Sequence, residues 1–468
     1  MLGLFGTLDL ASRSLATQQE GTAVAGQNMA NVNNPAYARQ QLNVQTSAPL
    51  DTTAGEEGTG DDVVSITEVR DSLLDSQIQS ENSATGSFTA QQSALQNAEA
   101  YLGEQITNTS GASAASANGL AAKLSNLFNS FSSLTTGAGD PAAVVQSAQE
   151  VATQFNQVSA NLSQVQSNLN TSIQNDVASS NQDLSDIAGL NQQIVLAEAG
   201  GGTANDLVDT REQTIENLAS MANISATAQA DGSVDISIGG VPMVTGGSAV
   251  NGLQTYDGGG GQLLIQDENS GTTLAVTGGS IGGSITARDG ALAGLQTSLD
   301  TLASQLITQV NNTYSAGYDA AGGTGQPFFT GAGAADIGVN SALVSDPTQF
   351  QASSAPGAGG DTQIALALAN LATQDNPALG NQSLTQSYAQ TVSNLGNAIN
   401  TATDQLNTSQ AISTTLANQR STESGVSIDE EMTNLMQFQK AYQASAQLVT
   451  TLNAMMEIVI DMDDPIST

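Results

Sequence analysis

The sequence predicts a mainly α-helical fold with a small β insert, in the α+β class. Apolar residues recur at alternating steps of three and four at both ends of the chain, which places them on one face of a helix. Long blocks with helical periodicity occupy most of the interior. A Gly-rich stretch with short β-type runs interrupts these blocks near the middle. We therefore expect terminal helices of coiled-coil type, a helical bundle arm and an inserted Gly-rich β domain.

The first helix is expected over residues 1–33. Its apolar positions average 3.5 residues apart, which is the spacing of a coiled-coil seam. The helix should end before Asn34-Pro35, because proline disfavours the helical conformation in the residue that precedes it. The predicted seam of this helix consists of Leu4, Leu8, Leu15, Met29 and Val32.

The last helix is expected over residues 428–460, with the same spacing. Its predicted seam consists of Leu435, Phe438, Tyr442, Val449, Leu452, Met456 and Val459. Each seam needs a partner helix, and the pattern leaves two alternatives open: a hairpin within one chain, or packing between copies. Polar seam residues such as Gln18, Thr22 and Ser445 weaken a simple two-helix pair, which favours an assembly of many copies.

Between the two ends, residues 35–75 are expected to be extended, and helical periodicity returns from Ser87. Composition changes after Met221, where short β-type runs flank Asp231-Gly232, a hairpin signal because glycine accepts a positive φ. We expect a core helix with an extended segment over 1–86, a helical arm over 87–221 and an inserted β domain over 222–284. A returning helix with loops should follow over 285–381, and C-terminal helices that pack with the N-terminal arm over 382–468.

The composition argues against several classes of function. The chain carries 8 Lys plus Arg against 44 Asp plus Glu, for a formal net charge of -36. Such a surface repels phosphate backbones and anionic lipid, so neither nucleic acid nor membrane is an expected partner. The chain has no Cys and no His, which removes the commonest general base and the thiolate metal ligands. No apolar run is long enough to span a bilayer, so we expect a soluble chain without cofactor or metal.

Two motifs have a catalytic or metal-binding interpretation and a simpler one. Gly278 to Gly282 matches the GxSxG nucleophile elbow around Ser280, but that chemistry needs a His base, so a tight turn is favoured. Four acidic residues fall at helical spacing and could hold a divalent cation, although a solvated helix face is the favoured interpretation in so acidic a chain. These residues are Asp206, Asp209, Glu212 and Glu216.

Several blocks resemble a known family. The start Gly3-Leu4-Phe5-Gly6, the block from Asn28 to Gln40 and the end from Gly425 to Met432 are similar to the termini of bacterial flagellar axial proteins. Three internal blocks narrow the resemblance to the flagellar hook-associated protein 1 family: Ala204 to Glu212, Gly278 to Asp289, and Tyr318-Asp319 with Phe328-Phe329. Ala36 and Ala38 stand where the family commonly has Gly and Ser.

The resemblance implies a structural protein of the bacterial flagellum, not an enzyme, that forms a junction ring between hook and filament through its terminal helices. It implies extracellular localisation after type III export. Its implied partners are other copies of the chain, the hook subunit, the second junction protein, the export apparatus and a cytosolic chaperone near the C-terminal helix. The alternatives are another axial protein, such as the second junction protein or the hook subunit, and a secreted enzyme or adhesin that uses a flagellar export signal.

Overall fold

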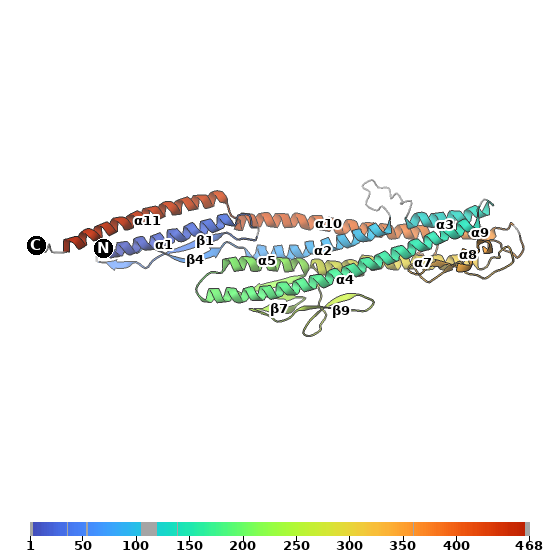
Figure 1. The fold of residues 1–468 in the computed structure, drawn as a ribbon, viewed down its shortest axis with the longest axis horizontal. Helices are drawn as coiled ribbons and strands as arrows, with labels where there is room; N and C mark the ends of the chain where they lie inside the picture. The colour runs from blue at the N-terminus through green and yellow to red at the C-terminus, as the bar shows by residue number, and fades with distance from the viewer. Residues whose placement is uncertain are drawn as a thin grey trace.

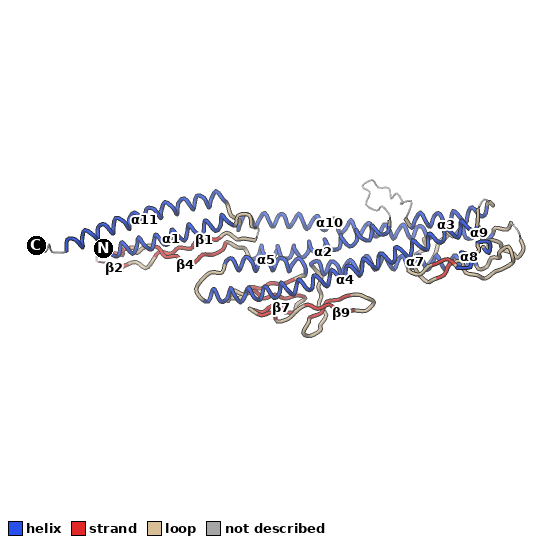
Figure 2. The backbone as a smooth tube through the Cα atoms, viewed as in Figure 1, coloured by secondary structure: helices blue, strands red, loops and turns tan. Residues whose placement is uncertain are grey.

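A computed structural model describes residues 3–34, 36–52, 55–103, 119–137, 139–358 and 360–463. The molecule is a long rod of nearly parallel helices, and both ends of the chain lie at the same end of the rod (Figure 1). Strands occupy three places: beside the first helix, in a lobe on one side of the rod, and at the end of the rod far from the first helix (Figure 2). The predicted mainly α-helical fold with a small β insert is confirmed. No helix among the described residues has the length and hydropathy of a membrane span.

The end of the rod that holds both termini is the arm. It contains α1 (Leu4–Ala30), α11 (Ile428–Asp463), and two small hairpins formed by β1 (Gln40–Thr46) with β4 (Asp61–Glu68) and β2 (Leu50–Thr52) with β3 (Gly55–Glu57). The helices α1 and α11 lie side by side and antiparallel, as expected for the two ends of the chain. Strands β1 and β4 contact α1.

The rest of the rod is the body, which is built from long helices. These are α2 (Ser72–Leu102), α3 (Leu120–Thr135), α4 (Pro141–Ala199), α5 (Asn205–Met221), α7 (Ala293–Tyr314) and α10 (Leu384–Ser424). Shorter elements complete its far end: β11 (Phe329–Thr330), β12 (Gly338–Val339), α8 (Ser341–Ser345), α9 (Gln363–Asn370) and the 3-10 turns Pro347–Gln349 and Pro377–Leu379. The core there includes edge-on aromatic pairs, with the Tyr314 ring 5.2 Å from those of Phe328 and Phe350.

Helix α2 begins fifteen residues earlier than the periodicity indicates, at Ser72 instead of Ser87. The Asp71 side chain caps it by accepting from the backbone N–H groups of Leu73 and Leu74. Its first turns bury only isolated residues such as Leu74 and Ile78 between polar ones, so the apolar period is hard to see in the sequence. The helical positions expected at 104–106 and 115–118 lie outside the described residues.

The β insert forms the lobe beside α4 (Figure 1). A four-stranded antiparallel sheet contains β5 (Ile224–Ala228), β6 (Val234–Ile238), β7 (Val241–Thr245) and β8 (Ser248–Ala249), and a separate hairpin contains β9 (Leu253–Asp257) and β10 (Leu263–Asp267). The turn between β5 and β6 places Gly232 at φ +85°, as the hairpin signal predicts.

Ser280 lies in α6 (Gly279–Thr286), which continues into a π-helical turn, Ala287–Leu292. The Ser280 hydroxyl donates to Asp176 Oδ2 at 2.5 Å, so its partner is a carboxylate of α4. The glycines of the motif allow close packing, because a Cβ on Gly283 would collide with the carbonyl oxygen of Ser87 in α2. This motif packs helices together.

Candidate assembly site

The contact between α1 and α11 is a tight seam of small residues. Gly21 lies under the ring of Phe438, so that a Cβ at this position would come within 2.5 Å of the ring. Two turns earlier, the hydroxyls of Ser14 and Ser445 lie 3.2 Å apart. These two contacts fix the relative position of the helices, because the Phe438 ring fits only where the opposite helix lacks a side chain.

The predicted seam residues flank this contact. On α1 the buried face consists of Ala11, Thr17, Gly21, Val24, Ala25 and Asn28. Nine of the twelve predicted seam residues are half-buried: Leu4, Leu8, Leu15, Met29, Val32, Leu435, Phe438, Val449 and Met456. Leu452 is buried, whereas Tyr442 and Val459 are exposed. Sequence reasoning placed the seam on the large apolar residues, but the small residues permit the closest approach of two helices. The role of the twelve residues in assembly stays a prediction.

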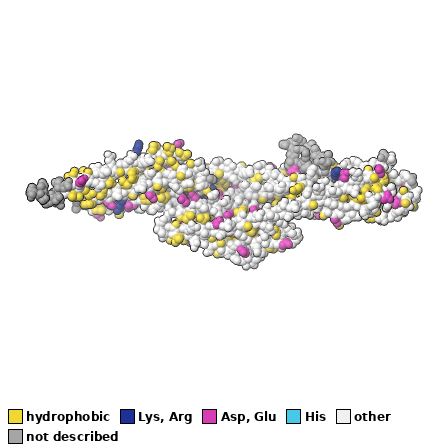
Figure 3. Space-filling model, viewed as in Figure 1, with side chains coloured by type: hydrophobic (Ala, Val, Ile, Leu, Met, Phe, Trp, Pro, Cys, Tyr) yellow, Lys and Arg dark blue, Asp and Glu magenta, His cyan; other side chains and the backbone are white. Residues whose placement is uncertain are grey.

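Much apolar surface remains exposed on α11. Hydrophobic side chains gather over the arm in Figure 3. The exposed apolar residues of α11 are Ile428, Met432, Met436, Tyr442, Leu448, Met455, Ile458, Val459 and Ile460. Soluble monomers rarely expose so continuous an apolar surface, which marks interaction sites. The exposed apolar surface of the arm is therefore a candidate interface with another molecule.

Where α1 ends, the chain turns back around Asn28. The Asn28 side chain donates to the Gln40 carbonyl oxygen at 2.9 Å, and its own oxygen accepts from Gln40 N–H and from the Tyr37 hydroxyl. Asn28 is buried, so this set of bonds satisfies a polar group that would otherwise be costly. The turn that carries the chain from α1 to β1 is thus held by one amide.

Helix α5 attaches the arm to the body. The Asp209 carboxylate accepts from the Ala38 backbone N–H at 3.2 Å and from the Arg70 guanidinium. Asn205 donates to the Ile66 carbonyl oxygen of β4 at 3.1 Å. On the opposite side of α5, Arg211 donates to the Gly232 carbonyl oxygen in the β insert at 2.7 Å. A single helix therefore contacts the arm and the β insert together.

The favoured interpretation of the acidic residues of α5 as a solvated helix face is wrong for three of the four, because only Asp206 is exposed, whereas Glu212 and Glu216 are half-buried. Asp209 is buried, and burial raises its pKa. Burial likewise raises the pKa of Glu212 and of Glu216. Their partners are arginines: Arg211 lies beside Glu212, and Arg420 pairs with Glu216 at 2.7 Å. No group of side chains within the described ranges has the arrangement of a metal site.

A pH dependence follows from Glu68, which pairs with Arg70 at 2.8 Å. Burial, together with the negative charge of Asp209, raises its pKa from 4.5 to about 7, against the effect of Arg70. A group whose pKa is raised in the folded state stabilises that state fully below its ordinary pKa, and this contribution is lost as the pH rises through the folded value. We expect Glu68 to contribute about 1.4 kcal/mol per pH unit over this window.

Unfolding titrations from pH 4.5 to 7.5 measure this contribution. The variant Glu68→Gln should show a free energy of unfolding that changes less with pH than that of the wild type. Asp404→Asn, at an exposed position of α10, is the control and should follow the wild type. Equal slopes in Glu68→Gln and wild type would contradict the expected role of Glu68.

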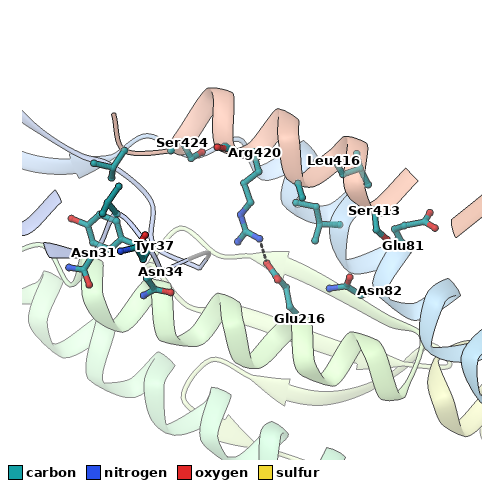
Figure 4. Close-up of a pocket in the computed structure, with 17 residues that line it drawn as sticks. Asn31, Asn34, Tyr37, Glu81, Asn82, Glu216, Ser413, Leu416, Arg420 and Ser424 are labelled. Atoms are coloured by element: carbon teal, nitrogen blue, oxygen red, sulfur yellow. Dashed lines mark ion pairs between the residues drawn. The ribbon is translucent and has the colours of Figure 1, made fainter. Parts of the chain in front are cut away.

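A cavity of about 490 Å³ lies at the joint where arm and body meet. Figure 4 shows it between the turn after α1 and helices α2, α5 and α10, with the Arg420–Glu216 ion pair across it. Its walls combine amides such as Asn31 and Asn82 with apolar residues such as Leu416. Only Leu74, Ile78 and Leu416 form a hydrophobic cluster in this part of the described chain. The joint is accordingly held mainly by polar contacts.

Sequence reasoning missed Asn28, Glu68, Arg70 and Arg420 as structural residues of the joint. Asn28 lies in a block that resembles flagellar proteins, and this is the one signal that pointed to it. The arginines could have been found by scarcity, since a chain with 8 basic residues places few of them without a partner.

The comparisons with known proteins agree with this architecture. A family model described as the flagellar hook-associated protein FlgK helical domain matches residues 104–329. A second, described as the flagellar basal body rod FlgEFG protein C-terminal, matches residues 417–462. Flagellar hook-associated protein 1 of Bacillus subtilis is 29% identical, over 98% of this chain and 99% of that protein.

The chain is similar to flagellar hook-associated protein 1 along nearly its whole length.

Other relatives have the same name and span. Flagellar hook-associated protein 1 of Escherichia coli is 23% identical over 97% of this chain and 98% of its own length. The structure of the flagellar hook junction protein FlgK from Burkholderia pseudomallei matches with a TM-score of 0.59 at 18% identity, over 74% of this chain and 98% of that one, which shows a shared fold. The FlgK match lies in the interior of the chain, and the rod-protein match lies at the C-terminal end that axial proteins share. The chain is therefore a structural protein of the flagellum.

Proposed function

We propose that this protein forms the junction ring between hook and filament by packing the arms of neighbouring subunits. The observation that carries the proposal is the exposed apolar surface of α11, which nothing in the described chain covers. Met455 and Ile458 are 50% and 61% exposed. Burying such a side chain in an interface contributes about 1.5–3 kcal/mol. Repeated around a ring, this contribution favours assembly.

The partners we propose are other copies of the chain, the hook subunit on one side and the second junction protein on the other. The protein acts outside the cell after type III export, with a cytosolic chaperone bound near α11. The exposed residues of α11 support a chaperone, because an uncovered apolar face promotes aggregation before assembly. A role without catalysis agrees with a chain that has neither His nor Cys.

Complementation of a strain that lacks the gene tests the proposal. The strain should have intact hooks, release unpolymerised flagellin and lack filaments, and the wild-type chain should restore them. The double variant Met455→Gln/Ile458→Gln should be exported but should leave filament number reduced about tenfold or more, because the buried apolar area of each interface is lost. Leu196→Gln, on the surface of the body at 75% exposure, is the matched control. Full motility of the α11 variant would contradict the proposal.

A further inference from the structure

The basic residues of this chain are few, and one of them forms no ion pair within the described residues. Within the described residues, seven of the eight Lys and Arg side chains form ion pairs: Arg13, Arg39, Arg70, Lys123, Arg211, Arg288 and Arg420. The eighth, Lys440, is exposed on α11 and has no partner in the described part of the chain. An unpaired cation on an apolar surface is unusual in a protein whose net charge is -36, because carboxylates far outnumber basic groups.

Lys440 lies at the centre of a ridge on the outer side of α11. Residues four apart form a continuous row on a helix. The exposed residues of this row are Ile428, Met432, Met436, Lys440, Ala444 and Leu448. A step of two residues turns a helix by about 200°, so Met436 and Lys440 point away from α1, which Phe438 contacts. If arms of several molecules lie side by side, with α11 of one next to its neighbour, this ridge faces that neighbour.

A matching anion lies at the same height on α1. Glu20 is exposed and has no hydrogen bond or ion pair within the described chain. The contacts of Gly21 with Phe438 and of Ser14 with Ser445 place residue 19 opposite residue 440. Glu20 is thus displaced from Lys440 by about one residue, or ~1.5 Å, along the arm. Both side chains point away from the seam, so they do not pair within one subunit.

Glu20 also lies beside a face that can accept the ridge. Ala16 and Ala23 are exposed small residues on the outward side of α1. A Met436 side chain packs more closely against alanine than against a branched residue. On the same helix, Asp9 is an alternative carboxylate, but it already pairs with Arg13 at 3.1 Å.

We propose that Lys440 of one copy pairs with Glu20 of the adjacent copy, so that the ridge of α11 packs on the outward face of the neighbour's α1 at the same height. The pairing rests on the proposed function as a ring. A heterologous contact closes into a ring when its rotation closes and when it has no displacement along the axis, and the equal height of the two charges meets the second condition. The ion pair selects the register of neighbouring arms, since a shifted copy would separate Lys440 from Glu20 and leave both charges unpaired.

Charge reversal tests the pair. Lys440→Glu and Glu20→Lys should each reduce filament number about tenfold or more in the deletion strain, because like charges then meet at every interface of the ring. The double variant Lys440→Glu/Glu20→Lys recreates the pair in the opposite sense and should restore filaments. Both positions are exposed without partners, so thermal unfolding of the purified variants should match the wild type. Gln410→Glu, which adds a negative charge to the exposed surface of α10, is the control.

A cross-linking experiment gives an independent readout. The chain has no cysteine, so Glu20→Cys/Lys440→Cys introduces the only two thiols. Oxidation of isolated flagella should yield dimers and higher multiples of this chain, whereas a variant with Glu20→Cys and Thr408→Cys should stay monomeric, because Thr408 lies in the body.

The outcomes separate this inference from the proposed function. Rescue by the double reversal together with the cross-linked multiples supports the pair. Single reversals that keep full filament number, or a double reversal that stays defective, would overturn the pair and leave the junction role standing. A wild-type chain that fails to restore filaments would instead overturn the junction role.

Discussion

Gly21→Ala is expected to loosen the arm, although alanine is normally the better helix former. The added Cβ would come within 2.5 Å of the Phe438 ring, so either the ring or the whole of α11 must move. Overpacking of this kind costs about 1–3 kcal/mol. Because the arm carries the proposed interface, we expect loss of filaments as well as faster hydrogen exchange in α1 and α11 of the monomer.

Gly26→Ala is the matched control for Gly21→Ala. Gly26 lies in the same helix, and a Cβ there would meet nothing within 4 Å. The substitution should stabilise α1 by about 0.5–1 kcal/mol, since glycine loses the most conformational freedom on folding. A second change, Phe438→Leu, should partly restore Gly21→Ala, because it removes the atoms that collide. If Gly21→Ala and Gly26→Ala stabilise the protein equally, the seam does not have the described geometry.

Asp209→Ala is expected to detach the arm from the body. The Asp209 side chain is buried, and its loss leaves the Ala38 N–H without its acceptor and Arg70 without one of its carboxylates. Arg70 keeps Glu68 and Asp75 as partners, so the cost comes mainly from the Ala38 N–H left without an acceptor, about 1–3 kcal/mol. Limited proteolysis near residues 34–39 measures the release of the arm directly.

Asp206→Ala is the matched control for Asp209→Ala. It lies one turn earlier in α5, and its bond from Gln40 is long, at 3.4 Å. This change should shift the cleavage rate much less than Asp209→Ala does. Equal cleavage rates in wild type and Asp209→Ala would contradict the role of α5 as the attachment of the arm.

The repeating patterns could be found in the sequence, and the long-range polar contacts could not. The heptad spacing predicted both terminal helices but left open whether they pair within one chain, and Asp231-Gly232 predicted the β insert, because each signal is local. Gly21 was not predicted as the centre of the seam, since a glycine has no apolar side chain to reveal the contact. Asp209 was interpreted as solvated because its partners, Ala38 and Arg70, are far from it in sequence.

The pairing of α1 with α11 joins the first and last parts of the chain. Such a contact closes a loop of more than 400 residues, so it is the most non-local in the molecule and carries the largest loop-closure entropy. The helices of the body are closer to one another in the sequence, so the body can form before this contact does. A partly delivered chain therefore lacks the arm altogether, and a subunit acquires its assembly surface only when its last helix has arrived. Because α11 comes last in the chain, only complete subunits can join the proposed ring.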